Sequence, residues 1–74
     1  IMKNFEILKN IALNAIGYCD AFIDSSMSEN ELFYAEGALS EAYFKFEKEA
    51  SKLNFTEEEI DNFWNEYSDE LKYE

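Results

Sequence analysis

Apolar residues recur at three- and four-residue steps along three segments of the chain, which is the periodicity of amphipathic helices. The pattern predicts helices over residues 4–24, 29–53 and 57–72. In the first segment the apolar positions are Phe5, Leu8, Ile11, Ala12, Ala15, Cys19, Phe22 and Ile23. With Ile16 and Tyr18 added, this stripe covers about half of the helix circumference.

The second predicted helix has a well-defined start. Ser28 and Glu31 have the spacing of a capping box, and Met27 and Leu32 occupy the two positions of a hydrophobic staple. The apolar positions then follow a heptad-like seam of Leu32, Ala35, Leu39, Ala42, Phe46 and Leu53. These signals predict that the helix begins directly after Ser28.

The third predicted helix repeats the same signature, with Thr56 and Glu59 as the capping box and Phe55 and Ile60 as the staple. Its apolar stripe consists of Ile60, Phe63, Trp64, Tyr67 and Leu71. Asn54 precedes this signature and is a candidate left-handed residue at the end of the second helix.

These elements predict one all-α domain spanning residues 1–74, folded as a compact three-helix bundle with short loops. The absence of proline and the presence of only two glycines argue against a turn-rich β fold. Short connections near residues 25–27 and 54–55 force neighbouring helices to run roughly antiparallel. The predicted core is Leu8, Ile11, Ala15, Phe22, Leu32, Leu39, Phe46, Ile60, Trp64 and Tyr67.

The composition limits how such a small domain is stabilised. The single core of a 74-residue chain rarely yields more than about 3–5 kcal/mol of net stability. Cys19 is the single cysteine and there is no histidine, which excludes an internal disulfide and a Cys/His zinc site. Seven Phe, five Tyr and one Trp supply buried area and distinguish the chain from a disordered acidic tail.

The net charge of −11, from seventeen acids and six lysines, is the most unusual property of the composition. Such a charge repels nucleic acid and anionic membranes and attracts cationic surfaces. We therefore expect a protein partner with a basic surface, with no direct binding to nucleic acid or membrane.

The chain carries no sign of membrane insertion or export. No apolar run approaches 18 residues, and no basic region followed by an apolar block is present at the beginning. One unpaired cysteine suits a reducing compartment, so we expect a cytoplasmic protein. Ile1 precedes Met2, and we take Met2 as the native start and Ile1 as a cloning remnant.

One face of the third predicted helix is almost entirely acid or amide. We call the acids of this face the acidic ridge: Glu58, Glu59, Glu66, Asp69 and Glu70. Lys72 at the edge is its one basic neighbour, whereas a surface shaped only for solubility usually intersperses lysines. The ridge is either a solvated acidic face or a surface that docks into a basic groove in place of nucleic acid.

The second predicted helix carries an additional apolar stripe, turned about a third of a circle from its seam. This phenylalanine stripe consists of Phe33, Gly37, Ser40 and Phe44. In one interpretation the helix is central and uses the seam for one neighbour and this stripe for the other. In the alternative, the stripe is an interface for a partner or for a second copy, with Phe33, Gly37 and Phe44 at the centre of a homodimer.

No combination of residues indicates an enzyme, a cofactor site or a metal site. The acid pairs at i,i+4 spacing are Asp20/Asp24, Glu57/Asp61 and Glu66/Glu70. A di-metal carboxylate site also needs histidines, and a calcium loop needs a pattern of acids and glycine that is lacking here. Cys19 has no histidine to activate it and is predicted to be a buried, inert thiol.

Two classes of function remain after these exclusions. The first is an acidic inhibitor that occupies the basic, nucleic-acid-binding channel of another protein, by analogy with phage and mobile-element proteins that counter host defence. An immunity protein or antitoxin against a basic toxin shares these electrostatics. The second is a helical adaptor or oligomerisation module that binds through the phenylalanine stripe, with the acids serving solubility.

Overall fold

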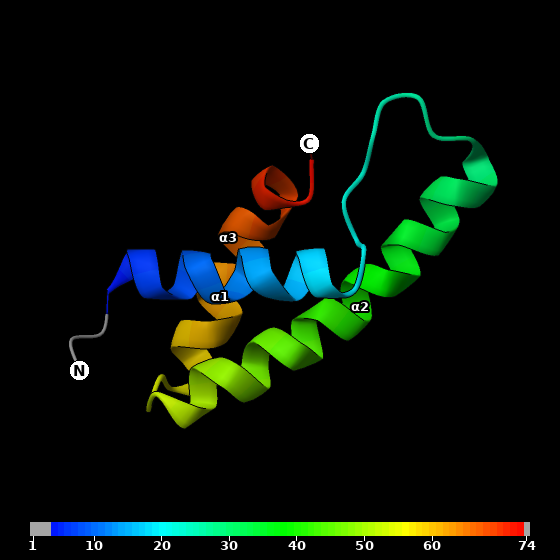
Figure 1. Ribbon diagram of the computed structural model, residues 1–74. Coiled ribbons are helices and arrows are strands. Elements are labelled where there is room, and N and C mark those ends of the chain that lie inside the picture. The colour runs from blue at the N-terminus through cyan, green and yellow to red at the C-terminus, as the bar shows by residue number, and fades with distance from the viewer. Residues whose placement is uncertain (1–3, 74) are drawn as a thin grey trace.

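The computed structural model describes residues 4–73, and this part of the chain folds as an all-α bundle of three helices with no strand (Figure 1). The helices are α1 (Phe5–Tyr18), α2 (Glu29–Lys52) and α3 (Glu57–Leu71). The predicted fold class is thus confirmed. The bundle measures 41 × 18 × 17 Å, because the first turns of α2 project beyond the end of α1. The expectation for Ile1 and Met2 lies outside the described residues.

Helix α1 ends at Tyr18, so the predicted continuation to residue 24 is wrong. Asp20 adopts a left-handed conformation with φ of 54°. The backbone N–H of Asp20 donates to the carbonyl of Gly17 at 3.2 Å, and that of Ala21 donates to the carbonyl of Ile16 at 2.9 Å. These two bonds form a Schellman motif, which satisfies the last carbonyls of the helix and turns the chain away from its axis.

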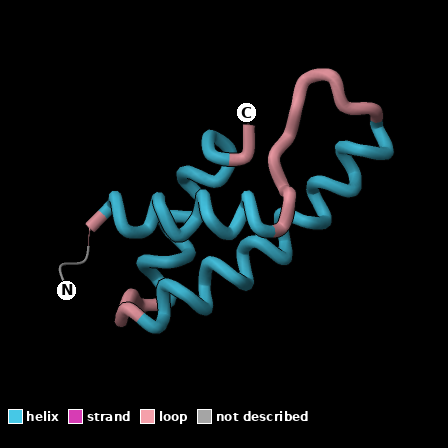
Figure 2. Tube along the Cα trace, in the orientation of Figure 1, coloured by secondary structure: helices cyan, strands magenta, loops and turns pink. Residues whose placement is uncertain are grey.

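The connection between α1 and α2 is the ten-residue loop 19–28, longer than the predicted break near residues 25–27 (Figure 2). Ala21 and Ile23 extend the apolar periodicity of α1, but they are buried as part of this loop. The N–H of Ile23 donates to the carbonyl of Lys72 at 2.6 Å, and Ile23 forms a single parallel bridge with Tyr73. The loop is therefore packed against the C-terminal end of α3.

Both predicted capping boxes are present. The Ser28 hydroxyl accepts the N–H of Glu31 at 3.3 Å, and the Glu31 carboxylate accepts the N–H of Ser28 at 3.1 Å. The corresponding bonds between Thr56 and Glu59 measure 3.1 and 2.8 Å. Each box satisfies N–H groups that a helix start otherwise leaves unpaired, and it sets the first residue of α2 and of α3.

Asn54 ends α2 as predicted, with φ of 67°. Its N–H donates to the carbonyl of Ser51 at 3.1 Å, and the N–H of Phe55 donates to the carbonyl of Ala50 at 3.3 Å. This second Schellman motif places Phe55 in the core, where it is buried. A four-residue connection, 53–56, is therefore enough to reverse the chain between α2 and α3.

The core combines small residues with large rings. Ala12 and Ala15 of α1 and Ala42 and Ala50 of α2 are buried, and such small side chains permit close approach of two helices. Phe46 of α2 is completely buried, and its ring lies 5.7 Å from that of Phe63 and 5.2 Å from that of Trp64, between ring centroids. The aromatic rings thus fill the space between α2 and α3.

The predicted core agrees with the structure in most positions. Four of its members are buried: Leu8, Ala15, Phe46 and Ile60. Five are partly buried and pack against the core: Ile11, Phe22, Leu39, Trp64 and Tyr67. Leu32 is only partly buried and is not among the residues packed on this cluster, because it lies in the projecting first turns of α2. Cys19, predicted to be buried, is partly buried.

Candidate binding surfaces

The acidic ridge lies on the solvent side of α3. All five of its carboxylate-bearing residues are exposed, whereas Ile60 and Phe63 on the opposite side of the helix are buried. The ammonium of Lys72 lies 3.0 Å from the Asp69 carboxylate. Helix α3 itself contains no lysine between Glu57 and Leu71, so every charged side chain along it is acidic.

Glu59 differs from the rest of the ridge because it has a structural role. Its carboxylate oxygen accepts the N–H of Thr56 in the capping box. The sequence already suggested both roles for Glu59, and the geometry supports the cap directly. The binding role of the ridge is therefore best assessed at Glu58, Glu66, Asp69 and Glu70.

Two lysines of α2 are engaged away from α3. The Lys45 ammonium lies 4.3 Å above the centre of the Tyr18 ring, which joins α2 to the end of α1 by a cation–π contact. The Lys52 ammonium lies 3.4 Å from the carboxylate of Glu49 on its own helix. Basic charge is thus concentrated on α2, and the ridge on α3 remains acidic.

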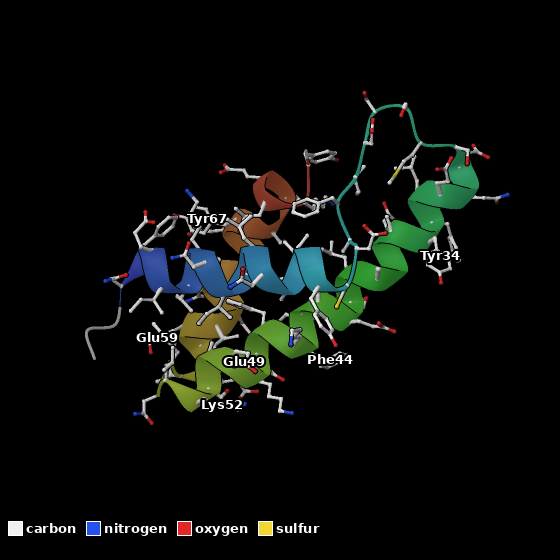
Figure 3. All side chains as sticks on the ribbon, in the orientation of Figure 1. Tyr34, Phe44, Glu49, Lys52, Glu59 and Tyr67 are labelled. Atoms are coloured by element: carbon white, nitrogen blue, oxygen red, sulfur yellow. The ribbon has the colours of Figure 1, made fainter. Side chains whose placement is uncertain are left out.

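The phenylalanine stripe faces solvent on α2. Phe33 is 81% exposed and Phe44 is 66% exposed, and Gly37 and Ser40 between them are also exposed. The interpretation that this stripe packs on a neighbouring helix within the chain is therefore wrong. The side of α2 that packs within the chain is instead the seam that includes Phe46, together with Tyr43 beside it. Figure 3 shows Phe44 on the side of α2 that faces away from α1.

No contact within the fold requires glycine at position 37. A Cβ atom added at Gly37 meets no atom within 4 Å, and the residue lies in the middle of α2 with ordinary helical φ. Glycine in a helix interior costs about 1 kcal/mol relative to alanine. At Gly17, by contrast, a Cβ would lie 3.6 Å from the ring of Phe22. Gly37 leaves a flat, open patch between the two exposed phenylalanines.

A shallow groove runs along each side of the phenylalanine stripe, and each groove contains one acid. The groove on the α3 side is lined by Glu36, Leu39, Ser40, Tyr43, Phe44 and Trp64. The groove towards the end of α1 is lined by Cys19, Phe33, Tyr34, Gly37, Ala38 and Glu41. No lysine within residues 4–73 lines either groove. Neither groove is evident from the sequence, because Trp64 and Cys19 reach them only through the tertiary fold.

Tyr43 links α2 to α3 beside the first of these grooves. Its hydroxyl donates to the carboxylate of Asp61 on α3 and lies 3.2 Å from that of Glu47 on α2. The bond to Asp61, partial burial and the bond to Glu47 together raise the pKa of Tyr43 well above its ordinary value. The Tyr43 ring also packs edge-on against Trp64, with 5.5 Å between ring centroids. This cluster orients the aromatic wall of the groove.

Two other kinds of site have no candidate among the described residues. Within residues 4–73, no three acidic, cysteine or histidine side chains are grouped so that they could hold a metal ion. In the same range, no helix combines the length and the apolar character needed to cross a membrane.

Comparisons of the chain with protein-family models, curated proteins and solved structures found no match. The fold defines the protein as a small all-α three-helix bundle, which presents two candidate binding surfaces, the phenylalanine stripe on α2 and the acidic ridge on α3.

Proposed function

We propose that this chain is a non-enzymatic binding protein whose acidic ridge docks on a basic, nucleic-acid-binding surface of another protein and so inhibits it. The observation that carries this proposal is the exposure of Glu58, Glu66, Asp69 and Glu70 on one face of α3, with Lys72 paired to Asp69 as the one adjacent lysine of the described chain.

The size and charge of the ridge suit such a surface. A helix of 15 residues is about 22 Å long. Duplex DNA places a phosphate charge about every 1.7 Å along its axis, so the ridge matches a short duplex in length but is sparser in charge. Electrostatic attraction over this distance favours encounter with a positively charged groove and is weakened by salt.

The residues available for chemistry support binding over catalysis. The sequence contains no histidine to serve as a general base near neutral pH. Its single thiol, Cys19, is partly buried against the core, and the Tyr43 hydroxyl is engaged by carboxylates. These features favour surface recognition as the function of the fold.

A charge-reversal experiment tests the role of the ridge. The variant Glu58→Lys, Glu66→Lys, Asp69→Lys, Glu70→Lys raises the net charge from −11 to −3. A control makes the same kind of change at three exposed acids that lie outside α3 and outside both grooves of the phenylalanine stripe, namely Glu6, Asp24 and Glu29. Both proteins should keep their helicity, because exposed substitutions usually change stability by less than about 0.5 kcal/mol each.

The readout is capture of proteins from the lysate of the native host at low and high salt. The proposal predicts a nucleic-acid-binding protein that is captured by the wild type and the control, lost with the ridge variant, and released as salt increases. Retention of the same protein by a correctly folded ridge variant would assign the acids to solubility alone.

A second candidate function is an adaptor that binds through the phenylalanine stripe, and the exposure of Phe33 and Phe44 favours it. Contacts of this kind depend mainly on apolar burial, so they should weaken less steeply with salt than contacts of the acidic ridge. Combined Phe33→Ala and Phe44→Ala substitutions should then abolish capture, whereas the ridge variant should not. A homodimer through the same stripe stays a prediction of the sequence.

A further inference from the structure

The phenylalanine stripe, the open position at Gly37 and the two acid-containing grooves all belong to one face of α2. This face points away from the seam that packs on α1 and α3, so the fold itself leaves it uncovered. It is on a different helix from the acidic ridge, and a binding role for it is independent of the function proposed for the ridge.

We propose that this face of α2 binds an amphipathic helix that carries lysine or arginine on both sides of an apolar stripe. The steps from Phe33 to Gly37, Ser40 and Phe44 are four, three and four residues, the spacing of one helix face. The stripe is about 16 Å long, or three helical turns. Phe33 and Phe44 bracket the site, and Gly37 with Ser40 lets the backbone of a helix approach between them.

Charge complementarity indicates which residues the partner helix carries beside its apolar stripe. Glu36 lines one groove and Glu41 lines the other, and no lysine of the described chain lines either. A partner helix with basic residues beside its apolar stripe would place one ammonium or guanidinium group towards each acid. Long basic side chains bury their methylene stems against apolar surface while the charge reaches an acid. The ring of Trp64 in the first groove adds a surface for a cation.

A second copy of this chain fits the same face poorly. It would bring its own Glu36 and Glu41 to grooves that already contain these acids, and it would add a further net charge of −11. Like charges facing each other across an interface oppose association. The same charge complementarity that disfavours a homodimer favours a basic helix.

The test uses the full chain and a labelled synthetic peptide of leucine and lysine, about 18 residues long, with its leucines on one helical face and no tryptophan. Fluorescence anisotropy gives the affinity, and the emission of Trp64, the single tryptophan, reports occupation of the groove beside Phe44. The matched peptide replaces every lysine with glutamate. We expect the lysine peptide to bind and to shift the Trp64 emission, and the glutamate peptide to bind at least about tenfold more weakly.

Variants separate this site from general attraction of a cationic peptide to an acidic protein. The double substitution Phe33→Ala, Phe44→Ala should lower the affinity for the lysine peptide by about tenfold or more. The control Tyr18→Ala removes an exposed ring from α1 and should change the affinity by less than about twofold. The ridge variant should also retain the affinity within about threefold, which keeps this test distinct from that of the ridge.

Gly37→Leu is the sharpest single change. Because a Cβ at position 37 meets open space, the variant should fold with an unchanged or higher melting temperature. The leucine side chain would nevertheless stand where the partner backbone has to approach, and the affinity should fall by about tenfold.

Three results would overturn the proposal. The first is equal affinity of the lysine peptide for the wild type and for the folded Phe33→Ala, Phe44→Ala or Gly37→Leu proteins. The second is equal binding of the lysine and glutamate peptides. The third is a wild-type dimer in sedimentation experiments that Gly37→Leu converts to a monomer, which would make a second copy the occupant of this face.

Discussion

At the scale of single residues, two phenylalanines of α2 that lie only two positions apart have opposite environments. Phe46 is completely buried and Phe44 is 66% exposed. Two residues correspond to a rotation of about 200° around a helix axis, so one ring points into the bundle and the other away from it. Identical side chains in the sequence therefore belong to the core in one case and to a candidate binding surface in the other.

This difference predicts unequal costs of truncation. Phe46→Ala should destabilise the fold by about 3–5 kcal/mol, which is close to the whole stability of a domain this small. Phe44→Ala should cost less than about 1 kcal/mol. Trp64→Ala should fall between them because Trp64 is only partly buried. Urea denaturation followed by circular dichroism measures all three, and similar values for Phe44→Ala and Phe46→Ala would contradict this packing.

Tyr43 gives a prediction about pH. Its pKa is raised in the folded state, mainly by the bond to Asp61, so the bonded phenol stabilises the fold fully below its ordinary pKa of about 10. This contribution is lost as the pH rises above that value. Tyr43→Phe should cost about 1 kcal/mol at pH 7, and its deficit relative to wild type should shrink at pH 11. A deficit that stays constant between pH 7 and pH 11 would assign no role to the phenol proton.

At the scale of elements, local hydrogen bonds determine where the helices begin, whereas their ends depend also on the chain beyond them. The boxes at Ser28 and Thr56 each involve residues three positions apart. The end of α1 at Tyr18 requires a left-handed Asp20, and it is accompanied by burial of Ala21 and Ile23 beyond it. The energy of that burial offsets the cost of the unusual backbone conformation.

Substitution of Asp20 tests this account of the loop. Asp20→Gly should stabilise the protein by about 0.5–1 kcal/mol, because glycine adopts the left-handed conformation without a steric penalty from Cβ. Asp20→Val should destabilise it by a similar amount or more, because a β-branched residue strongly disfavours positive φ. Thermal denaturation measures both variants. If glycine destabilised and valine were tolerated, α1 would continue past Tyr18 in solution.

At the scale of the whole molecule, repulsion among the excess acids lowers the stability that the small core supplies. The net charge of −11 is distributed over a bundle only 41 Å long, so the repulsion is spread through the entire domain. Charge of one sign destabilises a compact state, and salt screens it over about 8 Å at physiological ionic strength. The stability of this protein should therefore increase with ionic strength.

Specifically, raising sodium chloride from about 20 mM to about 500 mM should stabilise the fold by on the order of 1 kcal/mol, which corresponds to a rise of about 4–8 °C in Tm. The ridge variant, with a net charge of −3, should show a smaller rise. Calorimetry of both proteins in the same buffers makes the comparison. A salt response of equal size in the two proteins would show that general effects of salt, and not repulsion among the acids, determine it.

The parts of this fold that depend on neighbours within a few residues are predictable from the sequence alone. The three apolar stripes, the two capping boxes and the left-handed Asn54 involve groups that the chain brings together locally. Hydrogen bonds and periodicity over such short separations have the same geometry in almost any fold, so the pattern is enough to predict them. The exposed position of the acidic ridge belongs to this group as well, because it lies opposite the apolar stripe of α3.

Features that depend on competition between apolar surfaces became clear only from the packed bundle. Ala21 and Ile23 continue the apolar period of α1, and only their burial beside the end of α3 favours a loop over another helical turn. Helix α2 carries two apolar stripes, and the positions of α1 and α3 determine that the one containing Phe46 is buried and the one containing Phe44 is not. The physical reason is that the hydrophobic effect is non-directional. The sequence shows which side chains would be stabilised by burial, but the packing of distant segments determines which of them are buried.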